Sequence, residues 1–179
     1  TAFITVTFGL FFCTLASVAA AEPTTLSFDK TISLGTPEGR AADQFLISTE
    51  DGQVLMSWTE AGAKPRSRDA FLAILNGPDG AIGTPQRIND EAGRVHFYGG
   101  DNRTKLTVGP DGSVTAIWAA TLPEFRTGEL RTAHASPDGT FLPSARLNDD
   151  EIPVNHAFAT LATSPNGKVY AVWIDGRNR

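Results

Sequence analysis

The chain has 179 residues, of which 41% are hydrophobic and 20% charged, a composition typical of globular proteins rather than disordered or fibrous ones. Its 15 basic and 20 acidic side chains give a net charge of −5, so the basic surface needed to bind nucleic acid is not expected. A single cysteine, Cys13, excludes a disulfide framework and a cysteine-based zinc site. We predict no cofactor, no metal ligands and no nucleic-acid partner.

The first 21 residues contain no charged side chain, and their apolar run ends in Ala19-Ala20-Ala21. The run is short for a membrane span, and its small-x-small end is what signal peptidase accepts. We therefore predict a signal peptide over residues 1–21, with a secreted or periplasmic mature protein that is not attached to the membrane. An N-terminal membrane anchor is the alternative. The missing initiator Met and basic n-region suggest a fragment of a longer protein.

A thirteen-residue unit occurs three times in the chain, as Leu46–Trp58, Leu106–Trp118 and Leu161–Trp173. Each copy keeps Leu, an Asp-Gly or Asn-Gly pair, Val and Trp at the same spacing, with a period of about 58 residues. Asp-Gly and Asn-Gly between short runs rich in Val, Ile and Thr are typical of tight β-hairpins. The repeats therefore predict an array of antiparallel meanders.

Four strands are expected in each repeat, and no helical period is present in residues 22–179. The predicted strands are 44–49, 53–58, 70–76 and 84–89, then 104–109, 113–118, 129–135 and 143–148. The second strands are apolar at successive positions, so both of their faces should be covered by neighbouring sheets. These features predict an all-β fold, a β-propeller of four-stranded antiparallel blades, with Trp58, Trp118 and Trp173 as equivalent core positions between blades.

Residues 136–141, Ser-Pro-Asp-Gly-Thr-Phe, resemble a shortened Asp-box of the sialidase-like (BNR repeat) propellers, and residues 169–177 are similar to inner-blade segments of that family. The resemblance covers roughly residues 26–179. It implies six blades, of which this chain would supply about two and a half, near 44–89, 104–148 and 159–179. The remaining blades of the same protein are then its partners, and residues 25–34 would be an outer strand of the last blade. Asp138 is expected to serve the turn itself.

The long loops should gather on the rim opposite the tight turns, and they carry most of the arginines and the histidines His96 and His156. Guanidinium groups bind carboxylates bidentately, and aromatic rings stack on sugars, so a glycan, a sugar acid or another anionic small molecule is the expected ligand. The alternative is that these arginines are solvated surface. The candidate ligand-binding residues are Arg40, Glu60, Arg68, Arg94, His96, Tyr98, Arg126, Asp175 and Arg177.

The resemblance also implies a catalytic arrangement, in which Glu60 follows the second strand and Asp69 is the acid/base before the third. The family's Arg-Ile-Pro segment is absent, because Ala42-Asp43-Gln44 occupies its place. Its nucleophilic Tyr and the partner Glu would lie beyond Arg179, so the chain alone is expected to have no turnover. The hypotheses are therefore an exported sialidase-like glycoside hydrolase, a non-catalytic interaction propeller, or a six-bladed repeat protein with an unrelated ligand.

Two acidic stretches, residues 89–91 and 148–151, begin the loops that follow the predicted fourth strands. Their oxygen atoms suit a hard cation such as Ca²⁺. Repeated acidic loop starts are more often solvated turns, which is the interpretation we favour.

Overall fold

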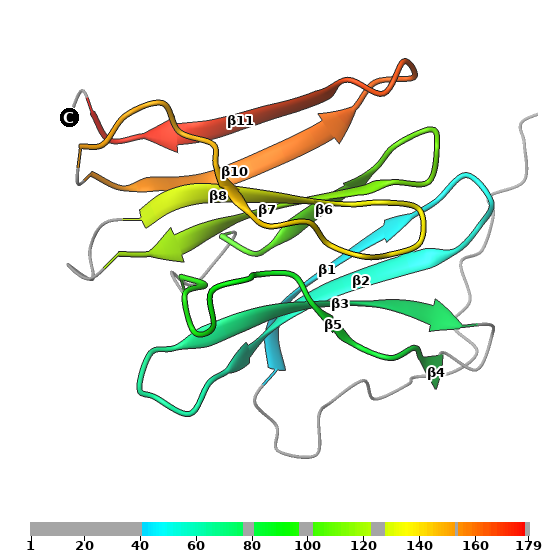
Figure 1. Cartoon of the computed structure of the whole chain (residues 1–179), viewed down its shortest axis with the longest axis horizontal. Coiled ribbons are helices and arrows are strands. Elements are labelled where there is room, and N and C mark those ends of the chain that lie inside the picture. Colours follow the sequence, from blue (N-terminus) through cyan, green and yellow to red (C-terminus); the bar gives the residue numbers. More distant parts are fainter. Residues whose placement is uncertain (1–40, 77–80, 97–101, 123–127, 153, 178–179) are drawn as a thin grey trace, which may run out of the picture. The chain divides into compact units, whose positions relative to one another are not determined.

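The computed structural model describes residues 41–76, 81–96, 102–122, 128–152 and 154–177, all within one compact unit that spans Ile32–Arg179. These residues form eleven β-strands and no α-helix (Figure 1). Accordingly, this part of the chain contains no helix that is long and apolar enough to span a membrane. The predicted signal peptide, the outer strand predicted at 25–34, and Arg40, Tyr98 and Arg126 lie outside the described residues.

The strands form three antiparallel sheets, each a meander in chain order. Blade 1 consists of β1 (Ala41–Ser48), β2 (Val54–Ala61), β3 (Arg68–Asn76), β4 (Ala81–Ile82) and β5 (Gln86–Arg87). Blade 2 consists of β6 (Lys105–Val108), β7 (Val114–Thr121), β8 (Gly128–Ala135) and β9 (Ala145–Arg146). The half-blade consists of β10 (His156–Thr163) and β11 (Val169–Asp175). Two blades and a half were expected from the repeats.

The outermost strands are shorter than predicted. The strand expected at 84–89 is the two-residue β5, and the one expected at 143–148 is the two-residue β9; β4, which also pairs with β3, was not predicted. The second strands, in contrast, extend beyond their tryptophans to Ala61 and Thr121. These extensions carry the sheets up to the loop-rich rim, where the candidate side chains lie.

The hairpin turns have the predicted chemistry. Gly52, Gly112 and Gly167 follow Asp or Asn in the turns after β1, β6 and β10, and their φ values are 84°, 82° and 80°. This left-handed backbone is strained for any residue with a Cβ, which explains the repeated glycine. In the β8–β9 turn, Asp138 Oδ1 accepts a hydrogen bond from the Thr140 amide at 3.0 Å, which confirms its expected role in the turn.

The three repeats are equivalent in register. Leu46, Leu106 and Leu161 pair with Met56, Ala116 and Ala171 respectively. The innermost strands β1 and β10 also share a β-bulge, centred on Asp43 in one and on Phe158 in the other, and both residues have a φ of 56°. The repeat therefore extends to a backbone irregularity that its sequence pattern does not reveal.

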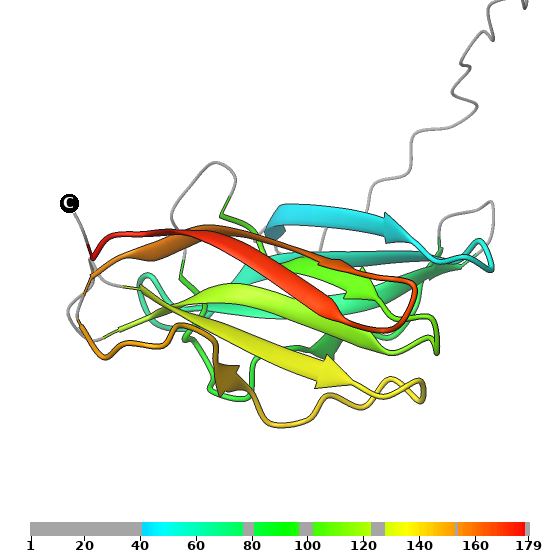
Figure 2. The same ribbon diagram turned by 90° about the horizontal axis from the view of Figure 1, so that it is seen from above.

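Sheet packs against sheet, as both views of the ribbon show (Figures 1 and 2). Leu55 and Leu72 of blade 1 pack in one apolar cluster with Trp118 of blade 2. On the other face of blade 2, Ile117 and Leu130 form a second cluster against which the half-blade packs. The innermost strands β1, β6 and β10 are neighbours in that order. A stack of sheets with the innermost strands side by side is the arrangement expected of propeller blades.

The tryptophans occupy equivalent places but differ in burial. Trp118 is 2% exposed and Trp58 is 5% exposed, with the ring of Phe71 stacked on Trp58 at a centroid distance of 5.9 Å. Trp173 is only half-buried, although it packs against the Ile117 cluster. The prediction of a core position between blades is therefore confirmed for Trp118, whereas Trp58 is buried in a cluster of blade 1 residues and Trp173 is only half-buried.

The outward face of the half-blade is apolar and exposed. Tyr170, Val172 and Ile174 all lie there, and Val172 is 67% exposed. The equivalent face of blade 2 is the one that the half-blade itself covers. This face thus has the composition of a blade-to-blade interface.

Candidate functional site

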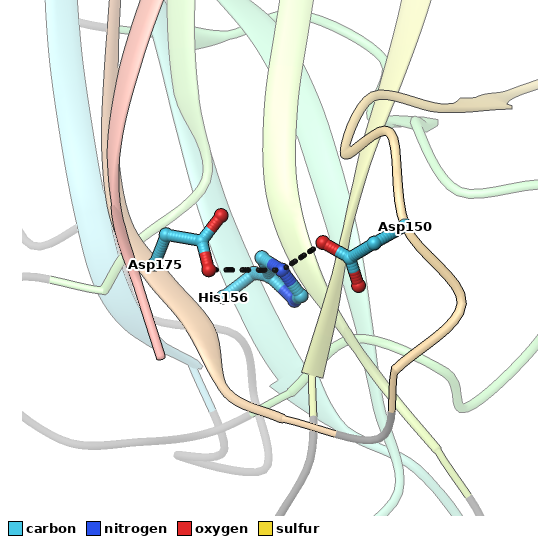
Figure 3. Close-up of side chains that lie close together, drawn as sticks. All are labelled: Asp150, His156 and Asp175. Carbon is cyan, nitrogen blue, oxygen red and sulfur yellow. Dashed lines mark hydrogen bonds and ion pairs between the residues drawn. The ribbon is translucent and has the colours of Figure 1, made fainter. Parts of the chain in front are cut away.

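The mouth rim is defined here as the edge of the sheets where β1 and β10 begin and where β2, β7 and β11 end. At this rim, the imidazole of His156 lies between the carboxylates of Asp150 and Asp175 (Figure 3). His156 Nε2 is 3.0 Å from Asp150 Oδ2 and 3.6 Å from Asp175 Oδ1. His156 is 1% exposed, so the cluster has a buried centre and carboxylates toward the surface.

The orientation of the imidazole is fixed from its other side. His156 Nδ1 lies 3.1 Å from the carbonyl oxygen of Gly128 in blade 2. Because a carbonyl oxygen can only accept a hydrogen bond, Nδ1 carries the hydrogen. Nε2 consequently faces the two carboxylates, either as a protonated donor or as a lone pair available to a cation.

A hydrogen-bonded clamp positions the loop that carries Asp150. Asn148 Oδ1 accepts from the Leu130 amide at 3.0 Å, and its Nδ2 donates to the Asp150 carbonyl at 3.1 Å. Asn89 repeats both bonds in blade 1, with the Ala70 amide and the Glu91 carbonyl. Both asparagines are buried, so the two acidic stretches begin with a structural residue rather than a solvated turn.

Arg177 lies over the outer side of the cluster. Its Nη2 is 2.7 Å from Asp175 Oδ2, its Nε is 3.2 Å from Asp150 Oδ2, and its Nη1 is 2.9 Å from Asp149 Oδ1. Hydrogen bonds from the Arg177 side chain and amide lower the pKa of the Asp175 carboxyl. Arg177 and Asp175, both predicted to be site residues, therefore belong to one cluster.

The predicted catalytic residue, Asp69, lies at the same rim in blade 1. Its Oδ1 accepts hydrogen bonds from Asn89 Nδ2 at 2.7 Å and from the Gly93 amide at 2.8 Å. Glu60 is its direct cross-strand neighbour, and Glu60 Oε1 accepts from the indole of Trp58 at 2.8 Å. The two carboxylates are thus held as a pair on one face of blade 1.

The other predicted residues are spread along the rim. Arg68 Nη1 donates to the Thr59 hydroxyl at 3.1 Å, and Arg94 Nη1 lies 3.3 Å from a Glu91 carboxylate oxygen. The backbone amide of His96 donates to the Ala119 carbonyl. These three residues do not join the His156 cluster, and Arg94 forms its ion pair with a carboxylate of the rim itself.

Sequence reasoning placed His156 on the loop-rich rim but did not select it, and it saw Asp150 only as part of an acidic stretch. The distances that join them to Asp175 come from the β10–β11 pairing, in which His156 lies directly opposite Asp175. The His156 imidazole and the carboxylates of Asp150 and Asp175 each offer one ligand atom, and these atoms lie within 4.8 Å of one another. Such a group is also able to hold a metal ion.

No protein-family model and no curated protein matches the chain. Among solved structures it is similar to the endo-arabinase from Bacteroides thetaiotaomicron VPI-5482, with a TM-score of 0.51 and 16% identity over 80% of this chain and 55% of that one. A thermostable family-43 glycoside hydrolase is more distant, with a TM-score of 0.45 and 10% identity over 82% of this chain and 50% of that one.

The chain spans about half the length of both solved structures. At this level of identity the likeness to the endo-arabinase concerns the fold alone. Neither structure is described as a sialidase, so the Asp-box resemblance and the six blades stay predictions. The chain is therefore a partial β-propeller of four-stranded antiparallel blades, with the fold found in glycoside hydrolase propellers.

Proposed function

We propose that this chain is part of an exported propeller that binds a glycan at its mouth rim. The observation that carries the proposal is the concentration of ionisable side chains at the rim between blade 2 and the half-blade. Asp150, His156, Asp175 and Arg177 meet there within hydrogen-bond distance or nearly so. Polar groups that converge at the mouth of an otherwise regular fold are typical of ligand sites.

The described arginines favour a glycan over a simple carboxylate ligand. Arg94 and Arg177, which the sequence offered as carboxylate receptors, already pair with Glu91 and Asp175. These two guanidinium groups are therefore already paired, and the remaining donors and acceptors of the rim suit sugar hydroxyls. A sugar acid would have to displace one of these internal pairs, so we place neutral glycans first and sialosides second.

Hydrolysis is the more specific form of the proposal, with Asp69 as general acid. Glycoside hydrolysis generally uses two carboxyl groups that flank the scissile bond, and Glu60 is the direct cross-strand neighbour of Asp69. The rival function, a non-catalytic interaction module, is favoured by the two hydrogen bonds that already occupy Asp69 Oδ1. Those bonds are what a carboxylate in a purely structural role would make.

Binding and turnover separate these functions when they are measured on the whole protein with arabinan, a neutral xylan and a sialyllactoside. We expect micromolar to millimolar binding of at least one glycan, and, if the protein is an enzyme, a loss of turnover of about a hundredfold in Asp69→Asn. Asp138→Asn, on the opposite rim, is the matched control. Binding without turnover would leave the interaction module, and no binding to any of the three would contradict the proposal.

Further blades of the same protein are the proposed cover of the exposed half-blade face. Its residues Tyr170, Val172 and Ile174 are equivalent to Thr115, Ile117 and Ala119 of β7, a strand whose Ile117 and Ala119 the half-blade covers. Uncovered apolar faces and strand edges promote association. We expect the 179-residue chain alone to self-associate in analytical ultracentrifugation and to lack turnover; a monodisperse, soluble monomer would argue against this cover.

Export is the remaining part of the proposal, and it rests on the uncharged apolar run and Ala19-Ala20-Ala21. Mass spectrometry of the protein recovered outside the cytoplasm should find Glu22 at the mature N-terminus. A mature N-terminus upstream of Phe12 would contradict cleavage at this position.

A further inference from the structure

We propose that Asp150, His156 and Asp175 form a binding site for one divalent transition-metal ion. The proposal does not depend on the glycan function, because it concerns a ligand of different chemistry and holds whether or not the protein binds sugar. The ligand atoms would be Asp150 Oδ2, His156 Nε2 and Asp175 Oδ1, which lie within 4.8 Å of one another.

The spacing of these atoms suits a shared ion. Metal–ligand bonds of about 2.0–2.2 Å place neighbouring ligand atoms about 3.0 Å apart at right angles and about 3.4 Å apart in a tetrahedron. The observed separations from His156 Nε2 are 3.0 Å to Asp150 Oδ2 and 3.6 Å to Asp175 Oδ1. The Asp150 and Asp175 oxygens lie no more than 4.8 Å apart, so an approach of the carboxylates would let one ion contact all three atoms.

The imidazole is oriented as metal-binding histidines generally are. A ligating histidine donates its other ring N–H to a carbonyl or carboxylate, which fixes the tautomer and aims the lone pair at the metal. Here the Gly128 carbonyl, 3.1 Å from Nδ1, takes that part. The carboxylates are supported as well, since Asp150 Oδ1 accepts from the Ile152 amide and Asp175 Oδ1 accepts from the Arg177 amide.

The cluster has a deficit of positive charge that a dication would fill. Asp149, Asp150 and Asp175 contribute three negative charges, and Arg177, which pairs with all three, contributes one positive charge. With a neutral imidazole the cluster carries a net charge of −2. A divalent ion removes this deficit, whereas protonation of His156 removes only half of it.

The fold does not require these side chains. His156 and Asp175 are directly opposite each other at the rim, and the equivalent pair between blades 1 and 2 is Val95 and Ala120. Matching backbone bonds establish the equivalence: the Gly176 amide donates to Asn155, and the Thr121 amide donates to Arg94. An apolar pair thus fills the same place at the first junction.

The donor set indicates the class of metal. One imidazole nitrogen and two carboxylate oxygens suit Zn²⁺ or Mn²⁺, whereas Ca²⁺ and Mg²⁺ prefer oxygen ligands alone. Asp150 lies on the loop after blade 2, while His156 and Asp175 lie on β10 and β11. The bound ion would therefore tie the half-blade to that loop, and metal binding should raise the thermal unfolding midpoint.

The test is direct titration of the chelator-treated whole protein with ZnCl₂ and, separately, MnCl₂, by isothermal calorimetry and by electron paramagnetic resonance of Mn²⁺. We expect one ion per chain and a rise in the unfolding midpoint. Asp175→Asn and Asp150→Asn each remove one charged ligand at nearly constant shape and should weaken binding at least tenfold. Arg177→Gln removes the competing cation and should leave binding equal or tighter.

Glu91→Gln is the matched control, because Glu91 occupies the place of Asp150 at the other blade junction, and it should not change the affinity. Circular dichroism of the metal-free variants checks that each one is folded. Absence of a stoichiometric ion in the wild type would overturn the proposal. So would binding that is unchanged in folded Asp150→Asn and Asp175→Asn, or binding that Glu91→Gln weakens as much as they do.

Discussion

The junction between blades 1 and 2 and the junction between blade 2 and the half-blade have the same backbone and different side chains. An asparagine clamp holds the loop in both, through Asn89 in the first and Asn148 in the second. At the first junction Glu91 pairs with Arg94, and Val95 faces Ala120. At the second junction an imidazole and two carboxylates fill that place. The repeat supplies the scaffold, and the ionisable cluster is an addition to it.

The largest expected effect comes from breaking the apolar contact at the first junction. Trp118→Ala should lower the free energy of unfolding by about 3–5 kcal/mol, because it empties a fully buried aromatic site. Trp173→Ala, at the second junction, should cost clearly less because Trp173 is only half-buried. Urea unfolding of the whole protein measures both; equal losses would contradict the difference in burial, and a loss under about 1 kcal/mol for Trp118 would place it at the surface.

The shared clamp should be of similar importance at both junctions. Asn89→Ala and Asn148→Ala each leave a buried strand amide without its acceptor, so we expect about 1–3 kcal/mol in each case. Aspartate keeps the acceptor oxygen but places a second oxygen against the Glu91 or Asp150 carbonyl, and in blade 1 against Asp69, so it should not restore the lost stability. If only one of the alanine variants were destabilised in urea unfolding, the two junctions would not share their scaffold.

Giving the second junction the side chains of the first should hardly change the free energy of unfolding. The double variant His156→Val with Asp175→Ala copies Val95 and Ala120, and replacing a buried charged cluster by apolar residues is often neutral. Without added metal we expect a loss of no more than about 1 kcal/mol. His156→Val alone should cost more, since it leaves two facing carboxylates without the imidazole. A double variant that does not fold would show that the cluster is structural.

The smallest effect concerns the contact between Asp90 of blade 1 and Ser144 of blade 2. Burial opposes the charge, but the Ser144 hydroxyl and amide, at 2.6 and 2.9 Å, lower the pKa of the Asp90 carboxyl. A lowered folded-state pKa contributes stability above the ordinary aspartate range, and this contribution is lost as the pH falls through the folded value. It should amount to less than about 1 kcal/mol because the carboxylate is exposed and screened. The Asp90→Asn variant should therefore be slightly less stable at neutral pH, and its free energy of unfolding should depend less on pH in the acid range. An unchanged acid dependence would show that this contact does not contribute.

The sequence was sufficient for the fold because its signals are local and repeated. Asp-Gly and Asn-Gly turns, and Leu and Trp at fixed spacing, predicted tight hairpins in all three repeats and the positions of the strands in the first two. The lengths of the outer strands were overestimated, because the ends of an edge strand depend on side-chain contacts and turns, which the periodicity of the sequence does not show. The half-burial of Trp173 could not be foreseen either, since it depends on which sheets are present around it.

The site was only half predictable, for a related reason. Asp175 and Arg177 could be selected because they end an inner-blade segment, and they are two residues apart in the chain. Asp150 and His156 join them through a strand pairing and a loop clamp, which no spacing rule reveals. Asp69 was correctly placed at the rim, yet its hydrogen bonds to Asn89 and Gly93 depend on residues 20 and 24 positions away in the sequence.

The left-handed residue Phe158 determines which way the His156 imidazole points. Side chains alternate along a strand, so Ala159 and Leu161, which pack toward blade 2, would by simple alternation send His156 to the opposite, exposed face. The extra residue at the bulge reverses the phase, and His156 turns inward to the Gly128 carbonyl instead. If β10 lost the bulge without losing a residue, the residues before Ala159 would shift by one position and the imidazole would point out of its cluster, while the rest of β10 stayed in place. A single β-bulge thus determines on which face of the sheet the imidazole of the cluster lies.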